Sequence, residues 1–290
     1  MTAPDRLNVF SSQRLTLSYC EWGAPTAPPL VLVHGGRDQK RSWDRVASAL
    51  SQSYRVIAFD LRGHGQSDWV SDGDYGVMDH VFDLSSLVDT LKLERFTLIG
   101  HSLGGNITLR YAGLYPGKIE KLVAIEGLGP SPRMLEERKA QPVTDRLRNW
   151  IEQRRSLSDR EPRVMENLAA AETRMKAAFT HLPDDLIQHL TLTGVKQHAD
   201  GSVSWAYDPA GMGRSASDIS HQDFVHLWTQ IACPTWLVYG ANSWASNPEE
   251  DGRVEPFQNA TVSLIAEAGH WLHHDQFDAF MPQLQDFLGS

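Results

Sequence analysis

A chain of 290 residues with 41% hydrophobic and 22% charged side chains is long and apolar enough to bury a large core, as one domain with an insertion. Its net charge of −9 argues against nucleic acid or an anionic membrane as the main partner, because an acidic surface attracts neither. The two distant cysteines, Cys20 and Cys233, predict buried thiols in a reducing compartment, and no apolar run has the length of a signal peptide or a membrane span, so we expect a cytoplasmic protein.

Strands and helices are predicted to alternate along the chain. Two segments near the N-terminus alternate apolar and polar residues, as edge strands do, whereas the later ones are continuous apolar runs typical of strands covered on both faces. The expected strands are Leu7–Phe10, Arg14–Trp22, Leu30–Val33, Val56–Phe59, Arg95–Ile99, Lys121–Ile125, Thr235–Tyr239 and Val262–Ile265. The expected helices cover residues 42–50, 81–91, 106–115 and 277–288. Such repeated units predict an α/β fold with a mainly parallel, doubly wound sheet.

The alternation breaks between residues 128 and 230, which we interpret as a helical insertion between core segments 1–127 and 231–290. Apolar residues recur there at helical spacing, in one stripe that includes Leu147 and Ile151 and in a second that begins at Met165. Arginines in this segment alternate with acidic residues, which favours a solvated helix face over an anion site.

The motif Gly100-His101-Ser102-Leu103-Gly104 lies where an expected strand turns directly into an expected helix. Gly-x-Ser-x-Gly at such a junction is the pattern of a nucleophile elbow, because the two glycines lack the Cβ atoms that would collide in so tight a turn. The start of the following helix adds unpaired N–H groups, which stabilise negative charge as it develops. Ser102 is therefore the candidate nucleophile, and the alternative is an ordinary serine in a glycine-rich turn.

A serine nucleophile needs a base, and His270 is the best placed candidate. It follows the last buried strand and a turn of two small residues, which sets it at the carboxyl edge of the sheet where Ser102 is expected. A neutral imidazole within about 3 Å of the serine oxygen takes its proton and returns it to the leaving group. His273 and His274 follow closely, but no cysteine or clear third carboxylate accompanies them, so we predict no metal site.

Four motifs, in this order and at these intervals, resemble those of the α/β-hydrolase superfamily. They are Val33-His34-Gly35-Gly36, the segment from Phe59 to Ser67, the segment from Gly100 to Gly105, and Ala268-Gly269-His270-Trp271. The resemblance implies an eight-stranded sheet with a helical cap inserted after the sixth strand. It does not imply one substrate, because the fold hosts esterases, lactonases, C–C bond hydrolases, dehalogenases and hormone receptors.

The acid that orients the histidine is where this chain departs from the commoner family pattern. Ser243 stands where that pattern has a carboxylate after the seventh strand, and a serine cannot balance an imidazolium. Glu126, which ends the sixth strand beside the elbow strand, is our preferred acid, because some family members carry the acid there and a charge at the end of an apolar run needs a partner. The acidic cluster Glu249-Glu250-Asp251 remains the alternative.

The resemblance also implies an oxyanion hole formed by two backbone N–H groups, those of Leu103 and Gly36. Arg37 either pairs with Asp38 or Asp60 or faces a substrate carboxylate. Three tryptophans on stretches expected to face the site, Trp205, Trp244 and Trp271, are candidate substrate contacts, although such residues more often pack a core.

Together these residues predict a cofactor-independent serine hydrolase that cleaves a small carboxylic ester or lactone, with an apolar or aromatic group, through an acyl-enzyme on Ser102. An aspartate nucleophile would have indicated dehalogenase or epoxide hydrolase chemistry, and the serine argues against both. The alternatives are a C–C bond hydrolase of a diketone-like ring-fission product and a small-molecule receptor on the same fold. The sequence leaves the natural substrate and a homo-oligomeric state open.

Overall fold

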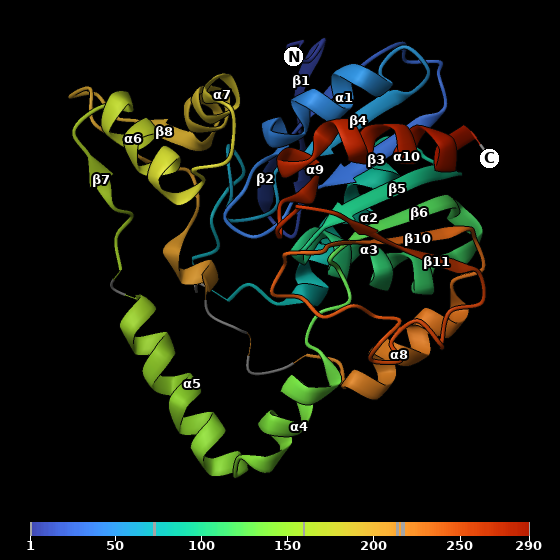
Figure 1. Cartoon of the computed structure of the whole chain (residues 1–290). Helices are drawn as coiled ribbons and strands as arrows, with labels where there is room; N and C mark the ends of the chain where they lie inside the picture. Colours follow the sequence, from blue (N-terminus) through green and yellow to red (C-terminus); the bar gives the residue numbers. More distant parts are fainter. Residues whose placement is uncertain (1, 72–73, 159, 213–214, 216–217, 290) are drawn as a thin grey trace.

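A central twisted sheet carries most of the molecule (Figure 1). The computed structural model describes residues 2–71, 74–158, 160–212, 215 and 218–289. The strands of this sheet are β1 (Arg6–Ser12), β2 (Leu15–Trp22), β3 (Pro29–Val33), β4 (Arg55–Phe59), β5 (Phe96–His101), β6 (Ile119–Ile125), β10 (Thr235–Gly240) and β11 (Ala260–Ile265). The sequence predicted all eight of them.

The strands lie in the order β1-β2-β4-β3-β5-β6-β10-β11. β1 and β2 pair antiparallel with each other, and β2 pairs antiparallel with β4, whereas every pair from β4 to β11 is parallel. The predicted doubly wound, mostly parallel α/β sheet is thus confirmed. Because parallel strands end at a common edge, the segments that follow β3, β5, β6 and β10 meet there.

Helices cover both faces of the sheet and enclose two apolar cores (Figure 1). On one face lie α1 (Asp44–Leu50), α9 (Leu272–Asp275) and α10 (Phe277–Gly289), and on the other lie α2 (Val77–Thr90), α3 (Leu103–Leu114) and α8 (His221–Gln230). The inner strands contribute side chains to both cores, which explains their unbroken apolar sequences.

The segment between β6 and α8 folds as helices with a small sheet. It holds α4 (Pro132–Ala140), α5 (Val143–Ser158), α6 (Leu168–Ala178) and α7 (Asp184–Gly194), and the strands β7 (Val164–Met165), β8 (Val195–Gln197) and β9 (Val203–Trp205). These strands form a three-stranded antiparallel sheet that the predicted helical stripes did not include. Met165, expected on a helix, lies in β7, and α6 begins only at Leu168.

The boundaries expected for the insertion, residues 128 and 230, remain a prediction. The helix α8 lies inside these boundaries and packs against α3 beside the main sheet. A Cβ on Gly113 of α3 would come within 2.5 Å of the Leu227 carbonyl oxygen of α8, so these two helices pack closely.

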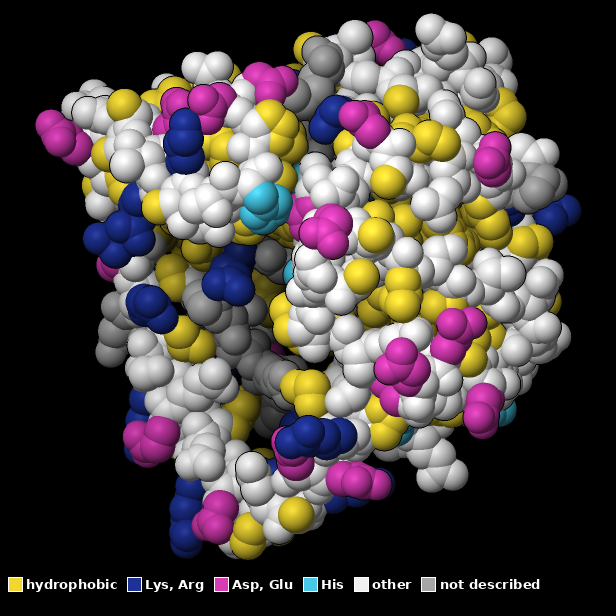
Figure 2. All heavy atoms as spheres, in the orientation of Figure 1, with side chains coloured by type: hydrophobic (Ala, Val, Ile, Leu, Met, Phe, Trp, Pro, Cys, Tyr) yellow, Lys and Arg dark blue, Asp and Glu magenta, His cyan; other side chains and the backbone are white. Residues whose placement is uncertain are grey.

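The helices α4 and α5 form an arm that stands away from the body (Figure 1). Figure 2 shows basic and acidic side chains interspersed over this arm. Arg133 pairs with Glu137, Arg148 with Asp145 and Arg155 with Glu152, at intervals of one helical turn. These exposed ion pairs are those of a solvated helix face, as the sequence predicted.

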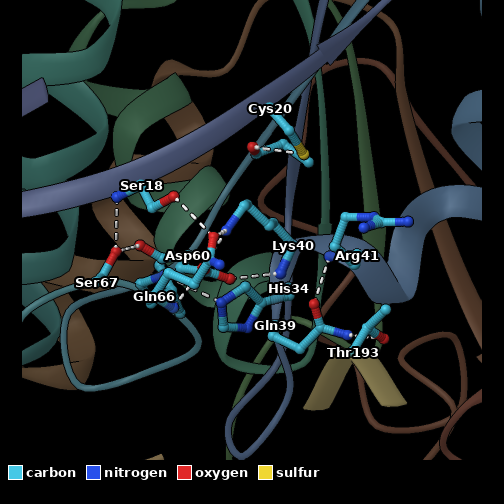
Figure 3. Close-up of polar contacts among 12 residues, drawn as sticks. Ser18, Cys20, His34, Gln39, Lys40, Arg41, Asp60, Gln66, Ser67 and Thr193 are labelled. Atoms are coloured by element: carbon cyan, nitrogen blue, oxygen red, sulfur yellow. Dashed lines mark hydrogen bonds and ion pairs between the residues drawn. The ribbon is translucent and has the colours of Figure 1, made fainter. Parts of the chain in front are cut away.

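A buried ion pair fixes the two turns that follow β3 and β4 (Figure 3). Lys40, in the short helix η1 (Lys40–Trp43), places Nζ 2.5 Å from Oδ2 of Asp60, and both side chains are almost completely buried. Asp60 also accepts the backbone N–H groups of Lys40 at 2.7 Å and Gln66 at 2.8 Å. Such a charge is tolerable inside a protein only while its partners remain in place.

Replacing Lys40 by Met should therefore lower the free energy of unfolding by about 3–5 kcal/mol, because the Asp60 carboxylate would keep its burial and lose its counter-charge. Urea unfolding measures this change. The matched control is Arg133→Met, which removes an exposed ion pair and should change the same free energy by less than about 0.5 kcal/mol. Equal effects of the two variants would contradict this account of the buried pair.

Candidate active site

Ser102 lies at the abrupt turn between β5 and α3. Its backbone has φ 53° and ψ −114°, a strained combination for a residue other than glycine. A Cβ on Gly100 would collide with the Gly104 carbonyl group, and a Cβ on Gly104 would collide with the Val33 carbonyl group of β3. The glycines of the motif therefore allow this turn, which holds Ser102 at the carboxyl edge of the sheet.

The structure brings His270 and Glu126 to Ser102. The Ser102 Oγ lies 2.9 Å from Nε2 of His270, and the other ring nitrogen of His270, Nδ1, donates to Oε2 of Glu126. With Nδ1 as the donor, Nε2 is free to accept the serine proton. The side chain of Glu126 is completely buried, whereas that of His270 is one quarter exposed. The three residues thus form one line of hydrogen bonds from a buried carboxylate to a hydroxyl.

Glu126 follows β6 in a strained backbone conformation of its own, with φ 50°. Its carboxylate also accepts the Gly240 N–H at 2.9 Å on Oε1 and the Ser243 hydroxyl at 2.7 Å on Oε2. Ser243, which sequence reasoning considered only as a missing acid, is a donor that holds the acid supplied by β6. The occurrence of a hydroxyl at that position was the signal that could have predicted this contact.

The alternative acidic cluster makes other contacts. Asp251 binds Nε of Arg253 at 2.8 Å and the Ser246 hydroxyl at 2.7 Å. Glu249 and Glu250 are exposed, and Glu250 accepts from the Asn247 amide at 3.3 Å. Of the candidate acids that the sequence left open, Glu126 is the one that contacts His270.

Two backbone N–H groups are available beside Ser102. That of Leu103 belongs to the first residue of α3, where N–H groups have no partner within the helix. That of Gly36 belongs to a peptide whose carbonyl oxygen, on Gly35, accepts from Nδ1 of His34 at 2.7 Å. Because the N–H and C=O groups of a trans peptide point in opposite directions, the Gly36 N–H points away from His34.

Gly36 is exposed, and the position of a Cβ on it would have no atom within 4 Å, so the space around it is open. A Cβ on its neighbour Gly35 would come within 3.3 Å of the Cβ of Ser102, which places this turn directly against the elbow. The arrangement is compatible with the predicted oxyanion hole.

The remaining predicted residues have different surroundings. Arg37 is exposed and, in the described part of the chain, forms no ion pair with Asp38 or Asp60. Of the two roles that the sequence left open, the structural pair is therefore wrong, and contact with a substrate carboxylate stays a prediction. The pair does not form because Asp38 binds the Gln39 N–H and the Ser42 hydroxyl, while Lys40 occupies Asp60. Burial raises the pKa of the Asp38 carboxyl to about 7.

Of the three tryptophans, Trp244 has its ring against the ring of His270. Its ring is 72% exposed, and its centre lies 5.0 Å from that of the His270 ring. Trp271 stacks on Phe179, which follows α6, at 4.5 Å between ring centres. Trp205 lies in β9 and packs against the small apolar cluster of the insertion. Trp244 therefore touches the candidate base directly, whereas Trp205 and Trp271 pack against the insertion.

Three buried histidines, His101, His273 and His274, contact one another next to His270. His101, in the elbow motif, donates from Nε2 to the His270 carbonyl oxygen at 2.9 Å, and its ring lies 4.7 Å from that of His273. The rings of His273 and His274 are 4.2 Å apart. Burial lowers the pKa of each of these three imidazoles, that of His274 to about 3. They are accordingly neutral at pH 7, and sequence reasoning gave them no such arrangement.

The buried His274 predicts a loss of stability in acid. Its pKa in the folded protein lies below the unfolded value of about 6.5, so the unfolded chain binds more protons as the pH falls below that value. Between pH 7 and pH 5.5 this one residue should cost about 1 kcal/mol of unfolding free energy. His274→Phe should remove that part of the loss, as measured by urea unfolding at both pH values. His226→Phe, at an exposed position on α8, is the control and should leave the loss unchanged.

Three further properties of the described residues bear on the predictions. No group of three histidine, cysteine, aspartate or glutamate side chains within them could hold a metal ion. Nor does any helix among them combine the length and the apolar character that crossing a membrane requires. Cys20 and Cys233 are both buried free thiols.

Comparisons with known proteins agree with this fold. Residues 28–277 match the family model of the alpha/beta hydrolase fold. The sn-1-specific diacylglycerol lipase ABHD11 of Xenopus laevis is 26% identical over 289 residues, which cover 98% of this chain and 87% of the relative. A putative esterase/lipase of Haemophilus influenzae is 26% identical, with 91% and 84% covered. Among solved structures, the thioesterase domain from the curacin biosynthetic pathway superposes with a TM-score of 0.83 at 24% identity and covers both chains completely.

Proposed function

Since this chain belongs to the alpha/beta hydrolase fold family, we propose that it is a serine hydrolase that cleaves a carboxylic ester or lactone through an acyl-enzyme on Ser102. The observation that carries the proposal is the line of hydrogen bonds from Glu126 through His270 to Ser102. A serine with a base at 2.9 Å, itself oriented by a buried carboxylate, is the arrangement that activates a hydroxyl for attack on a carbonyl carbon.

In the proposed reaction, Nε2 of His270 takes the Ser102 proton while Oγ attacks the carbonyl carbon. The resulting oxyanion accepts the N–H groups of Leu103 and Gly36, and the imidazolium is balanced by Glu126. His270 then returns the proton to the departing alcohol. A water molecule then gives a proton to His270 and attacks the acyl carbon. As the bond to Oγ breaks, His270 returns this proton to Ser102 and the acid product leaves.

The names of the relatives support acyl substrates. The Xenopus relative is named a diacylglycerol lipase, the Haemophilus relative a putative esterase/lipase, and the solved structure a thioesterase domain. For this chain we propose a small substrate with an apolar or aromatic group, because the exposed ring of Trp244 lies beside His270 and offers an aromatic surface at the candidate site. The insertion between β6 and α8 is proposed as its cap.

The first test is hydrolysis of a panel of p-nitrophenyl esters and lactones by the wild type and three variants. Ser102→Ala should abolish turnover, and Glu126→Gln should lower kcat by about 10²–10⁴-fold, because glutamine keeps an oxygen for the Gly240 N–H but cannot balance the imidazolium. Asp251→Asn is the matched control, since this carboxylate binds Arg253, and its kcat should stay within about twofold of wild type.

Near-wild-type activity of Glu126→Gln would show that another carboxylate serves the base. A wild type that is inert on the whole panel would reject the ester or lactone proposal. Its activity on a diketone-like ring-fission product would then test the alternative of a C–C bond hydrolase. A stopped-flow burst of p-nitrophenol equal to the enzyme concentration would be the direct sign of the acyl-enzyme.

Trp244→Ala tests the aromatic contact. Loss of an exposed ring from the proposed site should raise KM for p-nitrophenyl benzoate by roughly fivefold, about 1 kcal/mol, with little change in kcat, because the indole ring is proposed to contact the acyl group and takes no part in the proton transfers. The expected increase is smaller for p-nitrophenyl acetate, whose acyl group has no ring. Steady-state kinetics with both esters measure the difference, and equal KM changes would contradict an aromatic acyl contact.

A further inference from the structure

The turn after β3 presents two consecutive N–H groups near the elbow, those of Gly36 and Arg37. They differ in what they contact. The Gly36 N–H points away from His34, as described above, whereas the Arg37 N–H donates to Nε2 of His64 at 3.0 Å. Arg37 has φ 61°, a left-handed conformation that residues other than glycine adopt with strain.

His64 is fixed as an acceptor. Its Nδ1 donates to the Arg62 carbonyl oxygen at 3.0 Å, which leaves Nε2 without a proton and able to accept the Arg37 N–H. The residue is buried, and burial lowers the pKa of its imidazole, so the imidazole is neutral at pH 7.

The turn after β3 and the turn after β4 are joined by two hydrogen bonds, and each turn supplies one histidine as an acceptor. His34, from the turn after β3, accepts the Leu61 N–H of the turn after β4 at 3.0 Å. His64, from the turn after β4, accepts the Arg37 N–H of the turn after β3. The two rings meet edge to face, with 5.2 Å between their centres. The conformation of one turn is therefore tied to that of the other.

The loop that carries His64 is held from two directions. On the core side, Asp60 accepts the Gln66 N–H and pairs with Lys40, as Figure 3 shows. On the side of the insertion, the Gly65 N–H donates to the Ala206 carbonyl oxygen at 2.6 Å, and the Asp208 N–H donates to the Gly63 carbonyl oxygen at 2.8 Å. These two hydrogen bonds form an isolated antiparallel bridge between His64 and Tyr207. The segment 206–208 thus contacts the loop on both sides of His64.

From these contacts we propose that His64 is a positioning residue of the oxyanion hole: it binds the Arg37 N–H, keeps the preceding Gly36 N–H directed at the site, and joins this turn to residues 206–208 of the insertion. The inference rests on the proposed function, in which the Gly36 N–H stabilises the oxyanion. His64 acts through the backbone of its neighbour and touches no reacting atom.

Two substitutions separate this role from simple packing. Phenylalanine keeps the ring shape but accepts no hydrogen bond, whereas glutamine loses the ring and places an oxygen close to the position of Nε2. A residue needed only to fill space would tolerate His64→Phe better than His64→Gln. A residue needed as an acceptor gives the opposite order, and that order is the expected result.

In ester hydrolysis, His64→Phe should lower kcat by about 10–100-fold and change KM by less than about threefold. The reason is that a displaced Gly36 N–H stabilises the oxyanion of the transition state less well, whereas binding of the uncharged substrate changes little. His64→Gln should recover most of that loss. The control is His80→Phe, at a buried histidine of α2 that is outside the turn, and its kcat should remain within about twofold of wild type. Thermal unfolding of each variant verifies that it is folded.

A second readout needs no activity. Exchange of the Arg37 amide hydrogen, followed by NMR in the full chain, should be slow in the wild type and faster by tenfold or more in His64→Phe, and it should stay slow in His64→Gln and His80→Phe. Unchanged protection in His64→Phe would overturn the proposal, as would a full kcat in that variant or a lower kcat in His64→Gln than in His64→Phe. An inert wild type would reject the proposed function, and with it the oxyanion role of His64, while the exchange data would still decide whether the Arg37 contact exists.

Discussion

A buried carboxylate is stable only when hydrogen-bond donors surround it, and the site is organised around the donors that contact Glu126. Its donors come from the end of β10, from the hydroxyl that follows three residues later, and from His270 beyond β11. Any of these segments that moved away would leave a charge uncompensated in the interior. The hydrogen bonds of this one carboxylate therefore connect the carboxyl ends of two neighbouring strands and the loop that carries His270.

The same edge of the sheet is crowded, and the crowding sets the backbone of the site. Glycines in the elbow motif approach the carbonyl groups of β3 and of the following helix so closely that no side chain would fit. Ser102 and Glu126, at the ends of adjacent strands, both adopt positive φ angles. Strained backbone at two neighbouring strand ends is maintained because the surrounding strands and helices permit no alternative path.

Much of this was predictable, and the exceptions have physical causes. The eight strands follow from apolar runs, and the elbow from a glycine pattern, because burial and steric limits act locally on the sequence. The choice between Glu126 and the cluster ending in Asp251 could not be made with certainty, since it depends on which loop folds toward His270. Ser243 and His64 were missed as partners because their contacts join segments that are distant in the chain, and Arg37 lost its expected pair because Lys40 occupies Asp60. The small sheet of the insertion consists of strands of two or three residues, too short to leave a periodic pattern.

The position of the acid also bears on how such a protein can diversify. Because the carboxylate comes from the end of β6, the long connection between β10 and β11 contributes only the Ser243 hydroxyl to the hydrogen-bonded line, while carrying the exposed Trp244 beside the base. Mutations elsewhere in that connection can accumulate without removing the acid. The side chains of this loop can therefore vary beside His270 while the contact between Glu126 and His270 is kept.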